Sequence, residues 1–223
     1  TSINVYPLRD SGSTGTTLIG GTGLFQGTLT ASQILAYGGI PLTTTAAASS
    51  SSGPGYLELK AASQHRLQLG SVPFNIQDDH CVVAAFKSNT ANSYAFSNAK
   101  SGTLASACSI NINGSGYVQL YYKDDAGTTV YVTDPVDRRG QDVLATGWKV
   151  GSLIVLRING VQKATSSSAL SITTLDTCQL GALTGTSFLD GNLYPVLPIK
   201  GTLSLADVIL LEKQAASLAG VTL

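Results

Sequence analysis

The sequence predicts an all-β fold, a jelly-roll sandwich of two sheets with one C-terminal helix and an N-terminal arm. Three observations predict it. Short apolar segments follow one another closely from residue 56 onward. An Asn-Gly step joins two of these segments, and helical periodicity occurs only near the C-terminus. Gly, Ser, Thr and Ala are abundant while charged residues make up only 12% of the chain, which favours strands and turns over helices.

Residues 1–55 form the predicted arm or small subdomain. They hold glycine-rich segments with short apolar pieces and end in TTTAAASSSSGPG, a low-complexity stretch typical of a linker. This segment has too few large apolar residues to fold alone, so we expect it to dock on the main domain or on a partner. The main domain is predicted to span 56–223.

The main domain begins with a dense series of strand signals, which are apolar or alternating segments of four to eight residues. They lie at 56–59, 66–69, 80–87, 93–97, 107–112, 117–122, 129–133, 143–148, 153–158, 161–165, 177–182 and 193–199. Short strands at this spacing indicate a sandwich or jelly roll rather than a parallel α/β sheet.

The clearest turn is Asn159-Gly160, between the segments 153–158 and 161–165. Both central residues of the favoured hairpin turn need positive φ, which Asn and Gly tolerate best. The sequence therefore predicts a tight hairpin here.

The single predicted helix lies within 203–220. Ser204 followed three residues later by Asp207 is a variant of the capping box, and Gly220 is a natural C-cap. Its predicted apolar stripe consists of Val208, Leu211, Ala215 and Leu218. We expect this stripe to cover an edge or an end of the sandwich.

The order of these motifs resembles the concanavalin A-like (laminin-G-like) domains. Its opening is Tyr56–Leu59, then Leu67–Phe74, then His80–Lys87, and its end is the 153–165 hairpin, Leu189-Asp190-Gly191 and the closing helix. The resemblance covers 56–220 and implies a fold that binds far more often than it catalyses. At 62–65 the chain has Ala-Ser-Gln-His where family members often carry Asp, which weighs against calcium binding at that turn.

Low charge and an Ala-, Gly-, Ser- and Thr-rich composition also resemble accessory proteins of tailed bacteriophage particles. This resemblance implies a virion structural protein, such as a decoration, fibre or tail component. Its partners would be other virion proteins or itself, as a homo-oligomer. Two alternatives stay open: a carbohydrate-binding module that recognises a host-surface polysaccharide, and a glycoside hydrolase.

Charge and hydropathy exclude other classes of partner. The chain has 13 basic and 13 acidic residues and no basic cluster, which argues against a nucleic-acid partner. No run of 18 apolar residues predicts a membrane span, and the N-terminus lacks the apolar region of a signal peptide. We therefore expect synthesis in the host cytoplasm and a location in the virion.

Catalytic signatures are weak, so the prediction is a non-enzymatic protein with no catalytic residue and no cofactor. Glycoside hydrolysis needs two carboxyl groups about 5–9.5 Å apart. The only two Glu residues are Glu58, on an early strand, and Glu212, on the helix. His80 heads an apolar strand, where a structural role is expected, and neither a nucleophile elbow nor a phosphate-binding loop occurs.

Two further residue sets have a structural and a functional interpretation. Asp124, Asp125 and Asp190 offer oxygen ligands for calcium, but turn formation explains them as well, and we predict no metal site. Cys81, Cys108 and Cys178 lie in apparent strands, where we expect buried free thiols; a disulfide or metal role is the alternative.

The best ligand-binding candidates are Tyr117, Gln119, Tyr121 and Tyr131. The first three alternate with the apolar positions of 117–122 and so share the opposite face. If Tyr122 pairs with Val130, then Tyr121 lies opposite Tyr131 on the outer face. Tyr beside Gln suits a sugar, although the same face could instead cover a subunit contact.

Overall fold

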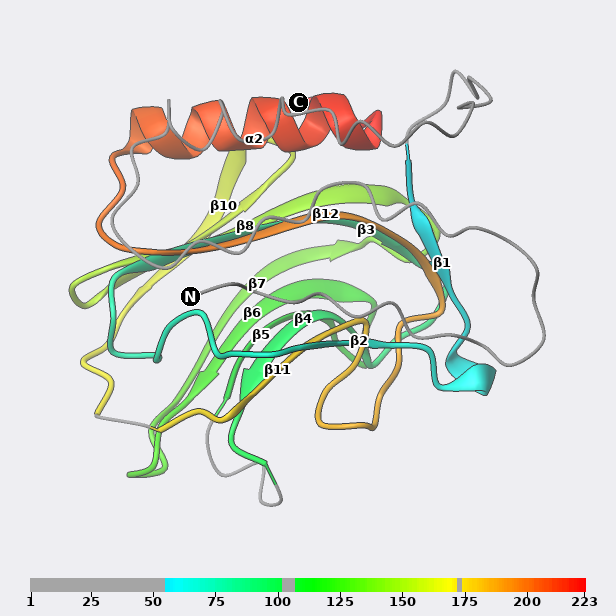
Figure 1. Cartoon of the computed structure of the whole chain (residues 1–223). Coiled ribbons are helices and arrows are strands. Elements are labelled where there is room, and N and C mark those ends of the chain that lie inside the picture. The colour runs from blue at the N-terminus through cyan, green and yellow to red at the C-terminus, as the bar shows by residue number, and fades with distance from the viewer. Residues whose placement is uncertain (1–54, 102–106, 172–173) are drawn as a thin grey trace, which may run out of the picture.

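A computed structural model describes residues 55–101, 107–171 and 174–223, which form two six-stranded sheets and one α-helix (Figure 1). The predicted arm, apart from Gly55, lies outside the described residues, so its boundary stays a prediction. No helix in these three ranges has the length and apolar character that a membrane crossing requires.

Each sheet is built from antiparallel neighbours. Sheet A runs β1 (Leu57–Leu59), β12 (Gly191–Lys200), β3 (His80–Ser88), β8 (Asp142–Val150), β9 (Leu153–Ile158) and β10 (Val161–Ser167). Sheet B runs β2 (Leu67–Leu69), β11 (Thr177–Leu180), β4 (Ser93–Ala99), β5 (Ala107–Ile112), β6 (Tyr117–Lys123) and β7 (Thr129–Asp137). Every strand coincides with a predicted segment, so the all-β sandwich is confirmed.

The main core lies between the two sheets. Alternate side chains of β6 (Val118, Leu120 and Tyr122) are fully buried there, while the residues between them are partly exposed. Phe86 and Leu156 meet them from sheet A. The period-2 pattern of the sequence therefore corresponds to one core face and one outer face on sheet B.

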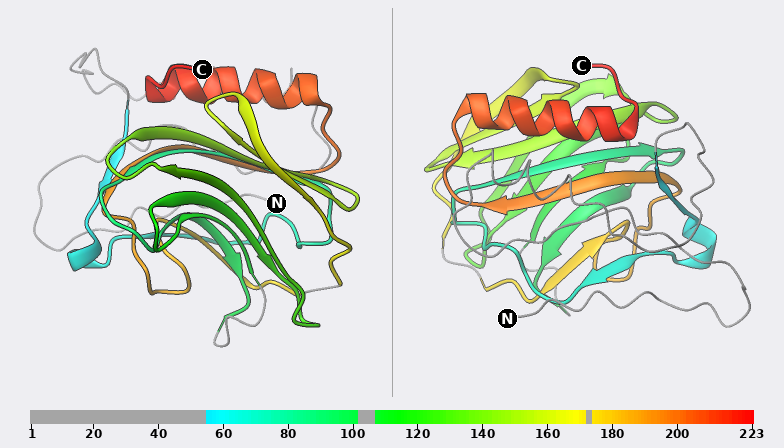
Figure 2. Two further views of the ribbon diagram at one scale, coloured as in Figure 1. Left: turned by 180° about the vertical axis from the view of Figure 1, so that it is seen from behind. Right: turned by 45° about the horizontal axis from the view of Figure 1, so that its top comes forward.

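The central strands of sheet A are buried on both sides, because the helix α2 (Leu205–Ala219) covers the outer face of β12, β3 and β8 (Figures 1 and 2). Every residue of β3 except Lys87 is buried, and Cys81, Val83 and Ala85 pack beneath the helix rather than in the main core. This explains why His80–Phe86 reads as an unbroken apolar run instead of an alternating one. The expectation that the helix would cover an edge or an end was wrong, since it covers a face.

The caps of α2 are those predicted. Ser204 accepts from the Asp207 amide and the Asp207 side chain accepts from the Ser204 amide, while Gly220 ends the helix at φ 67°. Three positions of the predicted stripe are buried, but Leu218 is 50% exposed and Ala216 and Ala219 face the sheet in its place. The buried face is thus rotated toward small side chains, which let the helix approach the sheet closely.

An ion pair fastens the same helix to β9. Arg157 Nε donates to Glu212 Oε1 at 2.8 Å and its Nη2 donates to Oε2 at 3.0 Å, with both side chains more than nine-tenths buried. The Arg157 guanidinium also donates to the carbonyl of Gly160, so the hairpin turn and the helix share one charged group.

Two turns have the backbone that their residues predict. Asn159 and Gly160 adopt φ 49° and 76°, and Asn159 Oδ1 accepts the Leu144 amide at 2.9 Å. Gly191 opens β12 at φ 149°, and a Cβ there would collide with the backbone carbonyl of Lys87. The Asp-Gly step of the sequence therefore marks the entry into a central strand.

His80 and the three cysteines have structural positions. His80 is fully buried, stacks on Phe74 with ring centroids 4.0 Å apart, and hydrogen-bonds the Asp78 carbonyl and the Tyr122 hydroxyl. All three cysteines are buried free thiols, as expected. Burial raises the pKa of Cys108 to about 12, so this thiol stays protonated and unreactive.

Candidate functional site

The outer face of sheet B carries the predicted tyrosine pair. Strands β4 to β7 curve, with the hollow of the curve on the side away from sheet A and α2 (Figure 2). The predicted register is confirmed: Tyr122 pairs with Val130, Tyr121 with Tyr131 and Gln119 with Thr133. The side chains proposed from the sequence therefore share one concave surface.

Tyr121 and Tyr131 form an aromatic contact on this surface. Their ring centroids are 5.2 Å apart with the planes inclined by 37°, within the range of favourable aromatic pairs. Tyr131 is 59% exposed and Tyr121 is half-buried. The pair thus presents ring surface to solvent while each ring supports the other.

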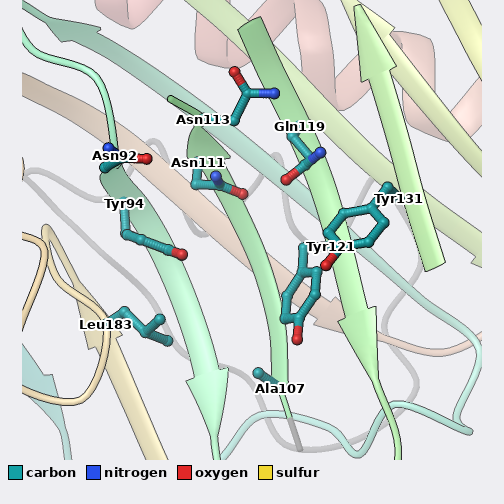
Figure 3. Close-up of a pocket in the computed structure, with 9 residues that line it drawn as sticks. All are labelled: Asn92, Tyr94, Ala107, Asn111, Asn113, Gln119, Tyr121, Tyr131 and Leu183. Carbon is teal, nitrogen blue, oxygen red and sulfur yellow. The ribbon is translucent and has the colours of Figure 1, made fainter. Parts of the chain in front are cut away.

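Beside the pair lies a shallow depression of about 340 Å³ (Figure 3). This volume is at the lower end of the range of roughly 300–1,000 Å³ for small-molecule sites. Its lining residues come from β4 to β7 and from the segments that adjoin them: Asn92, Tyr94, Ala107, Asn111, Asn113, Gln119, Tyr121, Tyr131 and Leu183. Below, "the depression" means this surface.

The floor of the depression is apolar. Ala99, Ala107 and Leu183 form a small buried cluster, against which Tyr94 and Tyr121 pack. Leu183 belongs to a turn after β11, closed by backbone hydrogen bonds in both directions with Thr186. A distant part of the chain therefore completes the surface begun by β4, β5 and β6.

The polar lining includes four side-chain amides, and hydrogen bonds hold two of them, Gln119 and Asn113, in position. Gln119 Nε2 donates to Thr133 Oγ1 at 3.1 Å. Asn113 Oδ1 accepts hydrogen bonds from the backbone amides of Ser115 and Tyr117. These two bonds hold the Asn113 side chain in one orientation. These contacts fix the amides before any ligand arrives, so ordering them on binding requires little further entropy.

The hydroxyls of Tyr94 and Tyr121 keep their protons at neutral pH. Burial, and then the neighbouring Tyr131, raise the pKa of Tyr94 above its ordinary value. Burial raises the pKa of Tyr121 as well, with smaller contributions from Tyr131 and Tyr94. Each hydroxyl can therefore both donate and accept a hydrogen bond.

Three of the four predicted residues line the depression, and the fourth does not. Tyr117 is on the same face of β6 but at its other end, opposite Asp137. Sequence reasoning missed Tyr94 because alternation places Tyr94 and Phe96 on one face. A bulge between them in β4 pairs Tyr94 with Asn111 and Phe96 with Ile110, so that Tyr94 turns outward.

The only two glutamates are far apart. Glu58 is on β1 and binds Lys60, whereas Glu212 binds Arg157 of β9 beneath the helix. Four strand spacings separate β1 from β9, about 19 Å at about 4.8 Å each, which exceeds the carboxyl separation of glycoside hydrolases.

The two ring nitrogens of His80 are bonded to a carbonyl and a tyrosine hydroxyl, and His65 Nδ1 faces the Lys60 amide.

The aspartates considered for calcium have different surroundings. Asp124 is buried: one oxygen accepts the Thr128 amide at 2.7 Å within the local turn, and the other accepts the amide of the distant Ser171 at 2.9 Å. Asp125 lies 3.8 Å from Lys100, and Asp190 accepts a long hydrogen bond from the Ala61 amide. Within the described ranges, no three His, Cys, Asp or Glu side chains gather as a metal site would require.

Neither protein-family models nor curated protein sequences match this chain, but solved structures do. The Ruminococcus gnavus IT-sialidase CBM40 bound to alpha2,3 sialyllactose matches with a TM-score of 0.54 and 15% identity, over 70% of this chain and 96% of that one. Domain 4 of AbnA, a GH43 extracellular arabinanase from Geobacillus stearothermophilus, in complex with arabinotriose, matches with a TM-score of 0.52 and 15% identity, over 69% and 74%. Domains LG4-5 of the mouse laminin alpha1 chain match with a TM-score of 0.52 and 13% identity, over 75% and 48%. These similarities confirm the lectin-like jelly-roll fold.

Proposed function

We propose that this protein is a non-enzymatic glycan-binding module and that the depression on sheet B is its binding site. The observation that carries the proposal is the Tyr121–Tyr131 pair beside pre-positioned amides on a concave surface. Two of the similar structures are named as a carbohydrate-binding module and as an arabinanase domain, each with an oligosaccharide bound. Their likeness in fold supports a binding role but does not identify the ligand.

The chemistry of the depression suits a sugar. One face of a pyranose or furanose ring carries C–H groups that stack on an aromatic ring, while its edge carries hydroxyls. Tyr131 offers exposed ring surface, and the carboxamides of Gln119 and Asn111 lie along the neighbouring strands (Figure 3). Hydroxyls both donate and accept, as do carboxamides and tyrosine hydroxyls, so the two sets are complementary.

A non-enzymatic role is supported by the positions of the acidic and basic side chains. The nine described residues of the lining include no carboxyl or imidazole group that could act as a general acid or base. The glutamates are separated and one of them is neutralised by Arg157.

The test is a glycan array followed by calorimetry with the best glycan. Tyr121→Ala removes one stacking ring, which is worth on the order of 1 kcal/mol, and should weaken binding about fivefold to tenfold. Tyr117→Ala is the matched control, since it removes the same side chain from the same face of the same strand outside the depression. It should leave the affinity unchanged.

Two results would contradict the proposal. The wild type could bind no glycan on the array. Alternatively, Tyr121→Ala could dissociate an oligomer and lower the melting temperature strongly, in which case this face is a subunit contact. A subunit contact on this face is the alternative role that the sequence left open for the exposed tyrosines.

The virion role stays a separate proposal, supported only by the composition of the chain. A glycan-binding module could serve in a phage particle or elsewhere, so the two roles are compatible. Immunogold labelling of particles would test the virion role directly, and labelling absent from them would contradict it.

A further inference from the structure

Resting on the glycan-binding function proposed above, we infer that the depression selects neutral glycans and discriminates against sialylated or sulfated ones. All nine described residues that line it are uncharged: four carboxamides, three tyrosines, an alanine and a leucine. The lining is therefore rich in dipoles but has no full positive charge.

An acidic sugar needs more than dipoles. A carboxylate or sulfate that leaves water requires a counter-charge, and proteins supply it most often with the bidentate guanidinium of Arg. In the depression an anion would instead find only neutral donors, the carboxamide N–H and tyrosine O–H groups, beside the rings of Tyr121 and Tyr131, whose π-clouds are negative. Neutral hydroxyls meet the same groups without a charge penalty.

The basic side chains nearby do not alter this balance. Arg139 is bound to Asp137 through Nε and Nη2, and Arg138 binds Asp134 at 2.9 Å, so both guanidinium groups are already neutralised. Lys123 is different: it follows Tyr121 on the same face of β6, opposite Thr129, but does not line the depression. Because it lies outside the lining, we expect Lys123 to contribute nothing to the selection.

The experiment uses an array in which each neutral glycan is printed beside its sialylated and sulfated counterparts. The full chain should bind neutral members at least about tenfold more tightly than their acidic counterparts. The affinity for the best neutral glycan should change less than about twofold between about 0.05 and about 0.5 M salt, because no charge pair forms. Preference for the acidic members would overturn the inference and leave the glycan-binding function intact, whereas no binding to either set overturns the function itself.

Three variants locate the selectivity. Gln119→Arg places a guanidinium beside Tyr121 and should reduce the preference for neutral glycans at least about threefold, while Gln119→Met, similar in length and uncharged, should keep it. Lys123→Gln should leave the preference unchanged. An unaltered preference in Gln119→Arg, or a changed one in Lys123→Gln, would show that the lining is not what selects.

Discussion

His80 is a titratable group enclosed between the sheets, where only its neutral form is stable. Desolvation lowers its pKa to about 4, against about 6.5 in an unfolded chain. Between these values the unfolded state binds a proton that the folded state does not, so stability is complete above about pH 6.5 and falls toward pH 4. At about 1.4 kcal/mol per unit the loss is roughly 3 kcal/mol.

Urea unfolding at pH 7 and at pH 4.5 measures this loss. His80→Gln should be less stable at pH 7, because the stacking on Phe74 is disturbed, but should lose much less between the two pH values. Aspartates with lowered pKa, such as Asp137 at about 2, act only at more acidic pH. An equal loss in the variant and the wild type would contradict the role of His80.

Gly191 is a second residue with a predictable effect. Gly191→Ala places a Cβ against the Lys87 carbonyl at a φ that disfavours side chains, so we expect a loss of about 3 kcal/mol or more. Gly127→Ala is the control: its φ is also positive, but nothing lies within 4 Å, and about 1 kcal/mol is expected. Equal losses in urea unfolding would show that strain alone, and not the collision, matters.

At the scale of elements, the Arg157–Glu212 pair fastens the helix to sheet A. Glu212→Gln leaves the Arg157 guanidinium buried without a counter-charge and should destabilise the fold by about 3 kcal/mol. Glu58→Gln, on an exposed pair with Lys60, is the control and should be neutral. Calorimetric melting checks stability, and an array checks that neither variant changes glycan binding; loss of an activity in either one would contradict the non-enzymatic function.

The elements that the sequence predicted are those with local signals. Alternating or unbroken apolar segments located the strands, Asn159-Gly160 located the hairpin, and Ser204 with Asp207 located the start of the helix. The register of β6 and β7 was predicted on the condition that Tyr122 pairs with Val130, and the structure has this pair. The alternation of these two strands therefore predicted three of the nine residues that line the depression.

The rest of the site depends on contacts that no local pattern encodes. The bulge in β4 reverses the face of Tyr94, and Leu183 reaches the floor from a turn that is distant in sequence. The buried face of α2 was not predicted correctly either, because the small side chains of Ala216 and Ala219 pack against sheet A while Leu218 is exposed. Each of these outcomes is decided by packing between segments far apart in the chain.

At the scale of the whole molecule, the described sheets and helix contain the two larger apolar cores. Deleting residues 1–42 should therefore leave a folded domain whose melting temperature changes little, while the predicted docking through the arm is lost. Circular dichroism and native mass spectrometry of the truncated chain check the two parts separately. Failure to fold would show that the arm belongs to the sandwich, and unchanged assembly would show that it is not the attachment element.

The pairing of the first strands with the last ones governs how this chain acquires its structure. Among the described strands, β1 pairs only with β12 and β2 only with β11, so the Leu57–Leu193 and Leu67–Leu180 pairs form only after the later strands have been made. Closing loops of that length carries an entropic penalty before any contact compensates it, and such topologies fold slowly. On a ribosome, neither sheet can be completed until nearly the whole domain has emerged. Until then the apolar run of β3 lacks its partner strand β12 and the covering helix α2, because both are synthesised after it. We therefore expect β3 to be a site of aggregation in the nascent chain.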